Sequence, residues 1–262
     1  MTDLFRLVEG EDEGEERSPV VLLHGGFLDH RMWAAQIPAL ATRHRVIAPD
    51  ARGHGRSPVA TAPFRHTDDL ADLLRDLDAG PAVLIGVSMG AATAVDTAVE
   101  HPDLVRALVI TGAGTSEPYF TDPWTVQALG TWTAAMAAGD LAGSVDGFMR
   151  FAAGPHRSAA DPAAERDLRA MATATMSKHA AGEPDWLRPV TGTWERVPSI
   201  AVPVLAVHGA LDSPDHIGMA QRVVDAVGEG RAVTVDGAAH YPNVERPYAY
   251  TKLVLEFLES LP

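Results

Sequence analysis

Short apolar runs alternate with amphipathic stretches along most of the chain. The predicted strands lie at 3–9, 19–23, 45–48, 82–85, 107–111, 203–208 and 231–235. Helices are expected over 32–41, over 67–79 with Thr67 as N-cap, from the end of the fourth strand to about Glu100, over 214–227 and over 246–260. Nearly continuous apolar strands that alternate with helices predict an α/β fold, with a mostly parallel central sheet covered by helices on both faces.

The middle of the chain breaks this alternation. Residues 115–195 are rich in Ala, Met and Trp, have helical character and contain no convincing strand. We interpret this segment as an inserted helical lid, which divides the core into 1–114 and 196–262. Near the N-terminus, the acidic segment 10–17 is expected to form a turn or a short second strand.

One predicted strand runs directly into Gly86-Val87-Ser88-Met89-Gly90, and a helical pattern of small residues follows at once. Glycines at the first and last position permit a sharp turn between strand and helix. A serine on such a turn is exposed to a base, while the start of the helix directs free N–H groups toward any oxyanion. The order strand, motif, helix therefore indicates a nucleophilic serine at position 88.

Two more reactive groups follow predicted strands, at the edge where sites of parallel sheets form. Asp212 comes after the strand at 203–208, and His240 comes after the strand at 231–235. A nucleophilic serine needs a base, and the base needs an acid to orient it. Asp215 and Glu117 remain alternatives to Asp212 as that acid.

Four motifs together resemble the α/β-hydrolase family over essentially the whole chain. They are His24-Gly25-Gly26 with Trp33 downstream, the segment Asp50 to Ser57, the Ser88 motif, and Asp212 with His240 followed by Asn243, Glu245 and Pro247. The order Ser, Asp, His is the one that this family uses. The resemblance is greatest to its esterase, enol-lactonase, C–C hydrolase and cofactor-free perhydrolase branches.

The resemblance implies a serine hydrolase that cleaves a small or medium ester or lactone through an acyl-enzyme. Ser88 would attack the acyl carbon, His240 would take and return the proton, and Asp212 would orient the imidazole. A serine at position 88 departs from the aspartate of dehalogenases and epoxide hydrolases. Perhydrolase or C–C hydrolase chemistry would use the same triad, and a non-catalytic protein that binds a small molecule is the alternative from another class.

The resemblance also implies the surroundings of the nucleophile. The backbone N–H of Met89 and that of Gly26, or alternatively Phe27, would form the oxyanion hole. The side chains expected to contact substrate are Phe27, Trp124, Trp132 and Tyr241. The polar side chains expected to fix loops rather than to act in catalysis are His24, Asp50, Arg52 and His54.

The amino-acid composition argues against some classes of binding partner. A net charge of −14 argues against nucleic acid and against anionic membranes. The chain has no cysteine, no apparent signal peptide and no apolar stretch of membrane-spanning length, so we expect a cytoplasmic protein. We expect a small acyl compound as partner, with neither cofactor nor metal. The three neighbouring residues Asp212, Asp215 and His216 are the alternative that would suggest a metal site. The oligomeric state, including a homo-oligomer, is left open.

Overall fold

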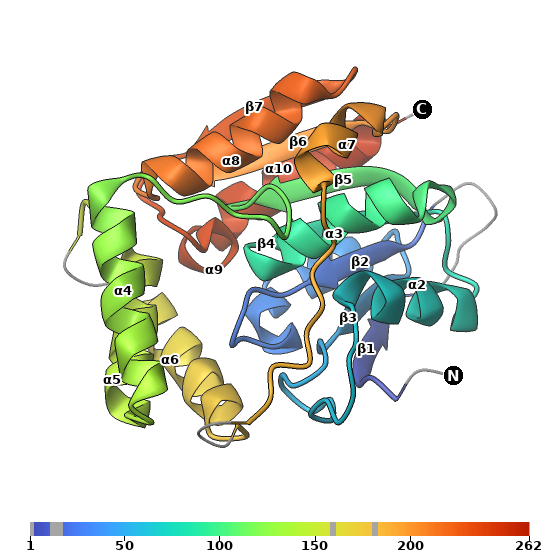
Figure 1. Ribbon diagram of the computed structural model, residues 1–262. Coiled ribbons are helices and arrows are strands. Elements are labelled where there is room, and N and C mark those ends of the chain that lie inside the picture. Colours follow the sequence, from blue (N-terminus) through green and yellow to red (C-terminus); the bar gives the residue numbers. More distant parts are fainter. Residues whose placement is uncertain (1–2, 11–17, 158–160, 180–182, 262) are drawn as a thin grey trace.

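The computed structural model describes residues 3–10, 18–157, 161–179 and 183–261. A central sheet of seven strands runs through it in the order β1-β3-β2-β4-β5-β6-β7 (Figure 1). The strands are β1 Arg6–Glu9, β2 Val20–Leu23, β3 Val46–Pro49, β4 Ala82–Val87, β5 Val105–Thr111, β6 Val204–Gly209 and β7 Gly230–Val235.

All neighbouring strands pair in parallel except β1, which is antiparallel to β3 at one edge. The strands β2 to β6 are almost wholly buried, as expected for runs of branched apolar residues with helices on both sides. The predicted mostly parallel sheet is therefore confirmed. Residues 11–17, for which a turn or second strand was expected, lie outside the described residues.

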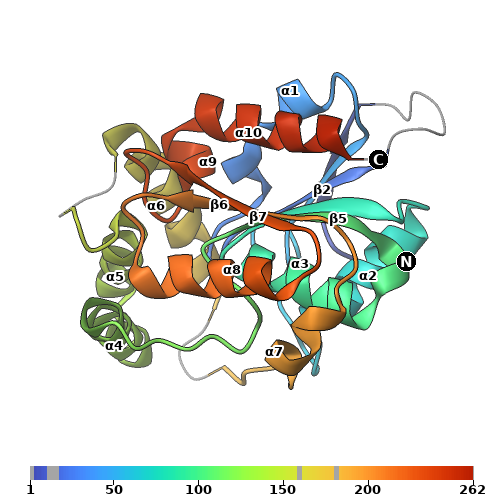
Figure 2. The same ribbon diagram turned by 90° about the horizontal axis from the view of Figure 1, so that it is seen from above.

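Helices cover both faces of the sheet (Figure 2). The core helices are α1 Ile37–Leu40, α2 His66–Asp76, α3 Met89–Glu100, α8 Pro214–Ala226, α9 Pro242–Glu245 and α10 Pro247–Ser260, with short 3-10 turns at His30–Trp33, Pro102–Leu104 and Val197–Ser199. On one face, Trp33 and Phe257 join a buried cluster under α1 and α10. On the other, Leu74 and Val223 join a cluster under α2, α3 and α8.

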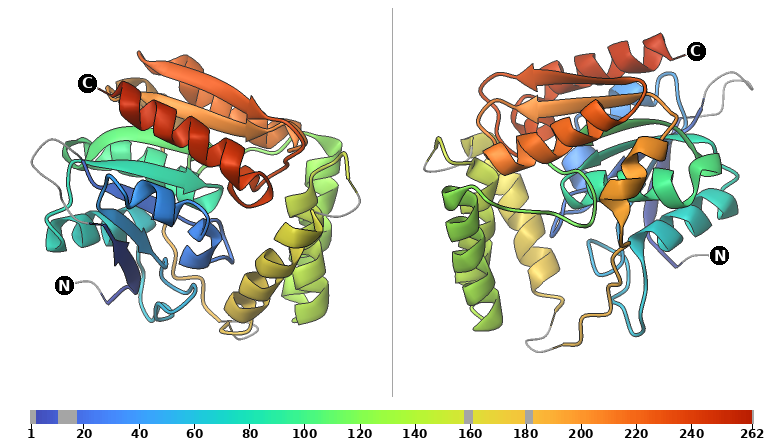
Figure 3. Two further views of the ribbon diagram at one scale, coloured as in Figure 1. Left: turned by 180° about the vertical axis from the view of Figure 1, so that it is seen from behind. Right: turned by 45° about the horizontal axis from the view of Figure 1, so that its top comes forward.

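A long helical insertion connects the adjacent strands β5 and β6. It contains α4 Pro123–Ala137, α5 Leu141–Ala153, α6 Pro162–Met176 and the short α7 Thr193–Arg196. Figure 3 shows α4, α5 and α6 standing together beside one end of the sheet. No strand occurs in the described part of 115–195, as predicted. The domain boundaries and the role of this bundle as a lid stay predictions.

Two local predictions are wrong. The helix expected over 32–41 is split into the 3-10 turn at His30–Trp33 and the short α1. Pro38 is the second residue of α1 and has no N–H to continue a helical ladder from the preceding turn, so it favours the first turn of a new helix. The N-cap of α2 is Arg65, and Thr67 lies inside the first turn.

None of the helices in the described ranges is long and apolar enough to cross a membrane.

Candidate active site

The turn from β4 into α3 holds Ser88 in a strained backbone conformation. Its φ of 55° lies in the left-handed region, which a residue with a side chain rarely adopts. The backbone N–H of Ser88 donates to Thr111 O at 2.8 Å, which fixes the turn against β5. A Cβ on Gly86 would collide with the backbone of Gly90, and one on Gly90 would collide with Leu23 O. Glycine at both positions therefore permits the close approach that presents Ser88.

The structure brings Asp212 and His240 together from the ends of β6 and β7. His240 Nδ1 lies 2.9 Å from Asp212 Oδ2, and both side chains are buried. The other ring nitrogen, Nε2, has no hydrogen-bond partner among the described residues. The imidazole is thus anchored through one nitrogen, and the second is left available.

Two histidines, His240 and His216, keep Asp212 in its ionised form. The sequence did not assign His216 to this role. Asp212 Oδ1 accepts from Ser213 N at 2.7 Å and lies 3.0 Å from His216 Nδ1. Burial alone would raise the pKa of Asp212, but the charges and hydrogen bonds of His240 and His216 outweigh it and lower the pKa far below its usual range. The His216 ring also lies 4.2 Å from that of His240, and burial lowers the pKa of His216.

Within the described residues, neither alternative acid forms a hydrogen bond with His240, and each binds backbone groups of the insertion instead. Asp215 accepts from the N–H groups of Thr121 and Asp122, both at 3.0 Å. Glu117 accepts from Thr193 N at 2.7 Å near the far end of the insertion. The geometry therefore favours Asp212 as the partner of His240.

The loop that carries His240 is braced from the helix that follows it. Glu245 accepts the N–H of Ala239 at 3.1 Å and pairs with Arg157 at 2.5 Å. On the other side, a Cβ on Gly112 would lie 2.6 Å from His240 Cε1. The Glu245 motif singled out in the sequence thus fixes the loop, while Gly112 leaves room for the ring.

The expected oxyanion donors lie on two segments that face each other. Met89 opens α3, whose first N–H groups have no partner within the helix. A Cβ on Gly26 would lie 3.9 Å from Met89 Cβ, so the loop after β2 approaches the helix start at this point. Phe27, the next residue, has a φ of 61°. The geometry is compatible with either Gly26 or Phe27 as second donor.

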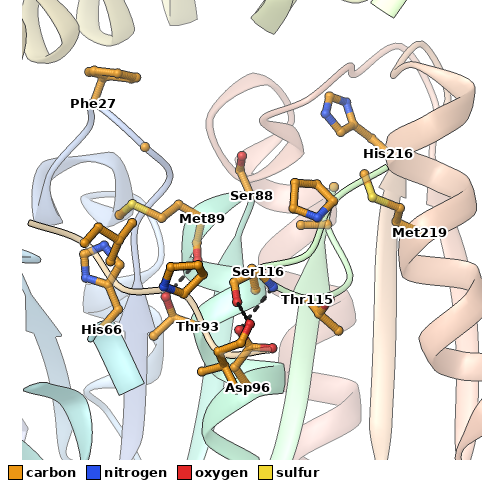
Figure 4. A pocket seen from close by; sticks show the side chains of 18 of the residues that line it. Phe27, His66, Ser88, Met89, Thr93, Asp96, Thr115, Ser116, His216 and Met219 are labelled. Carbon is orange, nitrogen blue, oxygen red and sulfur yellow. Dashed lines mark hydrogen bonds between the residues drawn. The ribbon is translucent and has the colours of Figure 1, made fainter. Parts of the chain in front are cut away.

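A cavity of about 320 Å³ opens beside Ser88, between the carboxyl ends of the strands and the helices α4 and α5 (Figure 4). Of the side chains expected to contact substrate, Phe27, Trp132 and Tyr241 line this cavity, and their contact with substrate stays a prediction. Trp124 is not among the described lining residues; its ring lies against the guanidinium of Arg150, 4.7 Å away. The mainly apolar wall suits a small or medium organic ligand.

Asp96 lines the same cavity, and the sequence reasoning missed it (Figure 4). It is an acid in the middle of the small apolar pattern of α3, and it is buried. A charged residue within an apolar helical stretch was the available signal. Burial is the main cause that raises the pKa of Asp96 to about 6.

The four polar side chains expected to fix loops do make such contacts. His24 Nε2 accepts Ala51 N–H at 2.9 Å, and Asp50 accepts Arg56 N–H at 2.8 Å. Arg52 pairs with Asp69 at 2.7 Å, and His54 Nδ1 lies 3.0 Å from Arg52 O. These bonds stabilise the loop after β3, beside the cavity.

The weak metal candidate does not converge, because Asp215 faces the start of α4. A different set, Asp212, His216 and His240, offers ligand-type atoms within 4.8 Å of one another. Both ring nitrogens that face Asp212 already lie within hydrogen-bond distance of its carboxylate. Hydrogen bonding is therefore sufficient to account for this cluster.

A sequence profile described as the alpha/beta hydrolase fold matches residues 18–247. The chain belongs to this family. It is an enzyme of the α/β hydrolase type, as the order and placement of its motifs predicted.

Several individual α/β hydrolases are similar to this chain over most of its length. A pimeloyl-acyl-carrier-protein methyl ester esterase of Aromatoleum aromaticum is 28% identical over 88% of this chain and 94% of its own. Epoxide hydrolase A of Mycobacterium tuberculosis is 30% identical over 98% and 94% of the two chains. The solved esterase RhEst1 from a Rhodococcus species is 25% identical, covers 99% and 95% of the chains and superposes with a TM-score of 0.77.

Proposed function

We propose that this α/β hydrolase cleaves small or medium carboxylic esters or lactones through an acyl-enzyme on Ser88. The observation that carries the proposal is the pairing of His240 Nδ1 with the buried Asp212 carboxylate, which leaves Nε2 without a hydrogen-bond partner among the described residues. A base anchored in this way accepts a proton through the other nitrogen.

The proposed reaction has two steps. Ser88 Oγ attacks the acyl carbon while His240 Nε2 takes its proton, and the oxyanion accepts N–H bonds from Met89 and from Gly26 or Phe27. His240 then returns the proton to the leaving alkoxide. Water, deprotonated by the same nitrogen, attacks the acyl-enzyme and releases the acid and Ser88.

Epoxide opening is not proposed, in spite of the relative with that name. An aspartate nucleophile would form an ester, which water can cleave, whereas Ser88 would form an ether that water does not readily cleave. An acyl group on serine is hydrolysable, so the nucleophile itself favours acyl substrates.

The direct test is steady-state hydrolysis of a panel of short acyl esters and lactones. We expect the wild type to turn over several of them and Ser88→Ala to lose at least about 10³-fold in kcat. Ser199→Ala removes an exposed hydroxyl on another element and should leave the rate unchanged. Hydrolysis that persists in Ser88→Ala would refute the mechanism, and no turnover at all would favour the binding-protein alternative.

A further inference from the structure

The cavity contains a second polar feature, the carboxyl group of Asp96. This side chain is 1% exposed, and its Oδ2 accepts the N–H of Ser116 at 3.1 Å (Figure 4). Its Oδ1 is buried and has no hydrogen-bond partner within the described chain. The buried aspartates with both oxygens hydrogen-bonded are Asp29, Asp50, Asp212 and Asp215. Asp96 therefore differs from them in leaving an acceptor unused.

The cationic side chains of the cavity do not supply the missing partner. Arg65 pairs with Glu100 at 2.5 Å, and Arg188 donates to Leu187 O at 2.9 Å. Neither forms an ion pair with Asp96 in the described structure. His66 also lines the cavity, but burial lowers its pKa to about 4, so it is neutral near pH 7.

An unsatisfied buried acceptor costs free energy, and the cost is greater when the acceptor is charged. In a native structure such a group calls for an explanation, and a functional role with a partner from outside the chain is one. Because Asp96 lines the cavity that also contains Ser88, the molecule in the best position to be that partner is the one that occupies this cavity.

The position of Asp96 fixes how far from the nucleophile its partner lies. Ser88, Ala92, Thr93 and Asp96 share one face of α3, and all of them line the cavity. Asp96 lies eight positions after Ser88 and seven after Met89, where α3 begins, so Ser88 and Asp96 are separated by a rise of about 12 Å. Allowing about 3 Å for the contact at each end leaves about 6 Å, or roughly five bonds of an extended chain.

We propose that Asp96 is a substrate-binding residue that accepts a hydrogen bond from a donor on the substrate, a hydroxyl or protonated amine roughly five bonds from the reacting carbonyl. The inference rests on the proposed hydrolase function and adds a substrate class to it: esters with a polar, donor-bearing end. The apolar wall between the two polar ends would contact the connecting chain.

The test compares matched substrates that differ only in the terminal group. Phenyl hexanoate is compared with its ω-hydroxy and ω-ammonium analogues, and butyl acetate with its ω-hydroxy analogue, so that the donor can enter from either side of the ester. We expect the wild type to prefer at least one donor-bearing ester by about 10- to 100-fold in kcat/KM, the ratio that one hydrogen bond to a charged group supplies.

Asp96→Asn is the decisive variant because it keeps the shape of the side chain. Its amide oxygen can still accept the N–H of Ser116, but its NH₂ group then presents a donor to the cavity. We expect the preference for donor-bearing esters over their matched partners to fall to about onefold in this variant. Asp72→Asn, which removes an exposed charge of α2 outside the cavity, should keep the full preference.

A loop-fixing role alone for Asp96 predicts a different pattern. All esters would then respond equally to Asp96→Asn, and the wild type would not distinguish the matched pairs; either result overturns the proposal. If no ester is hydrolysed, the proposed hydrolase function is refuted. The role of Asp96 in ligand binding is then tested separately, by thermal shift with non-hydrolysable amides. ω-Hydroxyhexanamide should then raise the Tm of the wild type more than hexanamide does, and equal shifts would overturn it.

Discussion

The carboxylate of Asp212 organises the residues around the nucleophile. Because its pKa is far below the usual range, the group is ionised and can only accept hydrogen bonds. Both His240 and His216 must therefore donate through Nδ1, since this nitrogen faces the carboxylate in each ring. In a neutral His240 the remaining nitrogen, Nε2, is consequently the proton acceptor.

Asp212→Asn should therefore damage catalysis while leaving Ser88 and His240 in place. An amide cannot accept from both rings at once, and its NH₂ would favour the wrong tautomer of His240. We expect kcat/KM for a good ester to fall about 10³- to 10⁴-fold. Asp215→Asn is the matched control and should cost less than about tenfold. Equal losses in the two variants would assign the orienting role to Asp215 instead.

At Asp96, substrate binding would be obtained at the expense of stability. Burial, with Glu117 and Glu100 nearby, raises the pKa of this group to about 6 from 3.8, although the Ser116 hydrogen bonds and the Arg65 charge oppose the shift. The unfolded state releases the proton more readily, so stability is lost as pH rises from about 4 to 6.

Asp96→Asn should consequently stabilise the protein at high pH and not at low pH. The shift of about two pKa units corresponds to about 3 kcal/mol at pH 8, where the wild type is ionised. We expect the free energy of unfolding of the variant to exceed that of the wild type by about 2–3 kcal/mol at pH 8, with the difference vanishing near pH 4. Urea titrations at the two pH values measure it. A difference independent of pH would contradict the raised pKa.

Among the elements, the β4–α3 turn depends on close backbone packing. Gly90→Ala would place a Cβ against Leu23 O and His24 O, so we expect a loss of about 1–3 kcal/mol in the free energy of unfolding. Gly218→Ala is the control, because nothing lies within 4 Å of its Cβ position in α8. There alanine should stabilise the helix by about 0.5–1 kcal/mol. Thermal unfolding of both variants checks the contrast.

Helix α4 contributes one wall of the cavity through Trp132, which contacts Phe27 and Phe148. Trp132→Ala should cost about 3–5 kcal/mol in stability and enlarge the cavity, so the preference among acyl esters should move to longer chains. Trp124→Ala, outside the described lining, should leave the chain-length profile unchanged. Profiles of kcat/KM against chain length distinguish the two, and a shift in the Trp124 variant alone would reverse the assignment.

The sequence predicted the elements well where the local pattern decided them. Apolar runs such as 82–85 became buried strands, and the motif around Ser88 lies at the expected strand–helix turn. The prediction of one helix over 32–41 was wrong because Pro38 interrupts the helical hydrogen bonds that the apolar pattern suggested. Asp96 was missed, and His216 was considered only as a metal ligand, for another reason. Their importance depends on which helix face meets the cavity, and spacing alone does not reveal this.

At the scale of the whole molecule, the site exists only where distant segments meet. Ser88, Asp212 and His240 follow three strands of one sheet, and Phe27 and Trp132 approach from a loop and from the insertion. Chain order and the rule that reactive groups gather at the carboxyl ends of parallel strands were enough to predict the first three. The wall contributed by the insertion depends on how its helices pack, which the sequence pattern does not specify.

The proposed mechanism depends on the activation of Ser88 as a nucleophile by His240. Intact mass after exposure to a fluorophosphonate tests it most directly, because the reagent phosphonylates an activated serine and ignores ordinary hydroxyls. We expect one adduct on the wild type and on Ser199→Ala, none on Ser88→Ala, and much slower labelling of Asp212→Asn. An unlabelled wild type that is well folded, or an adduct that survives Ser88→Ala, would contradict it.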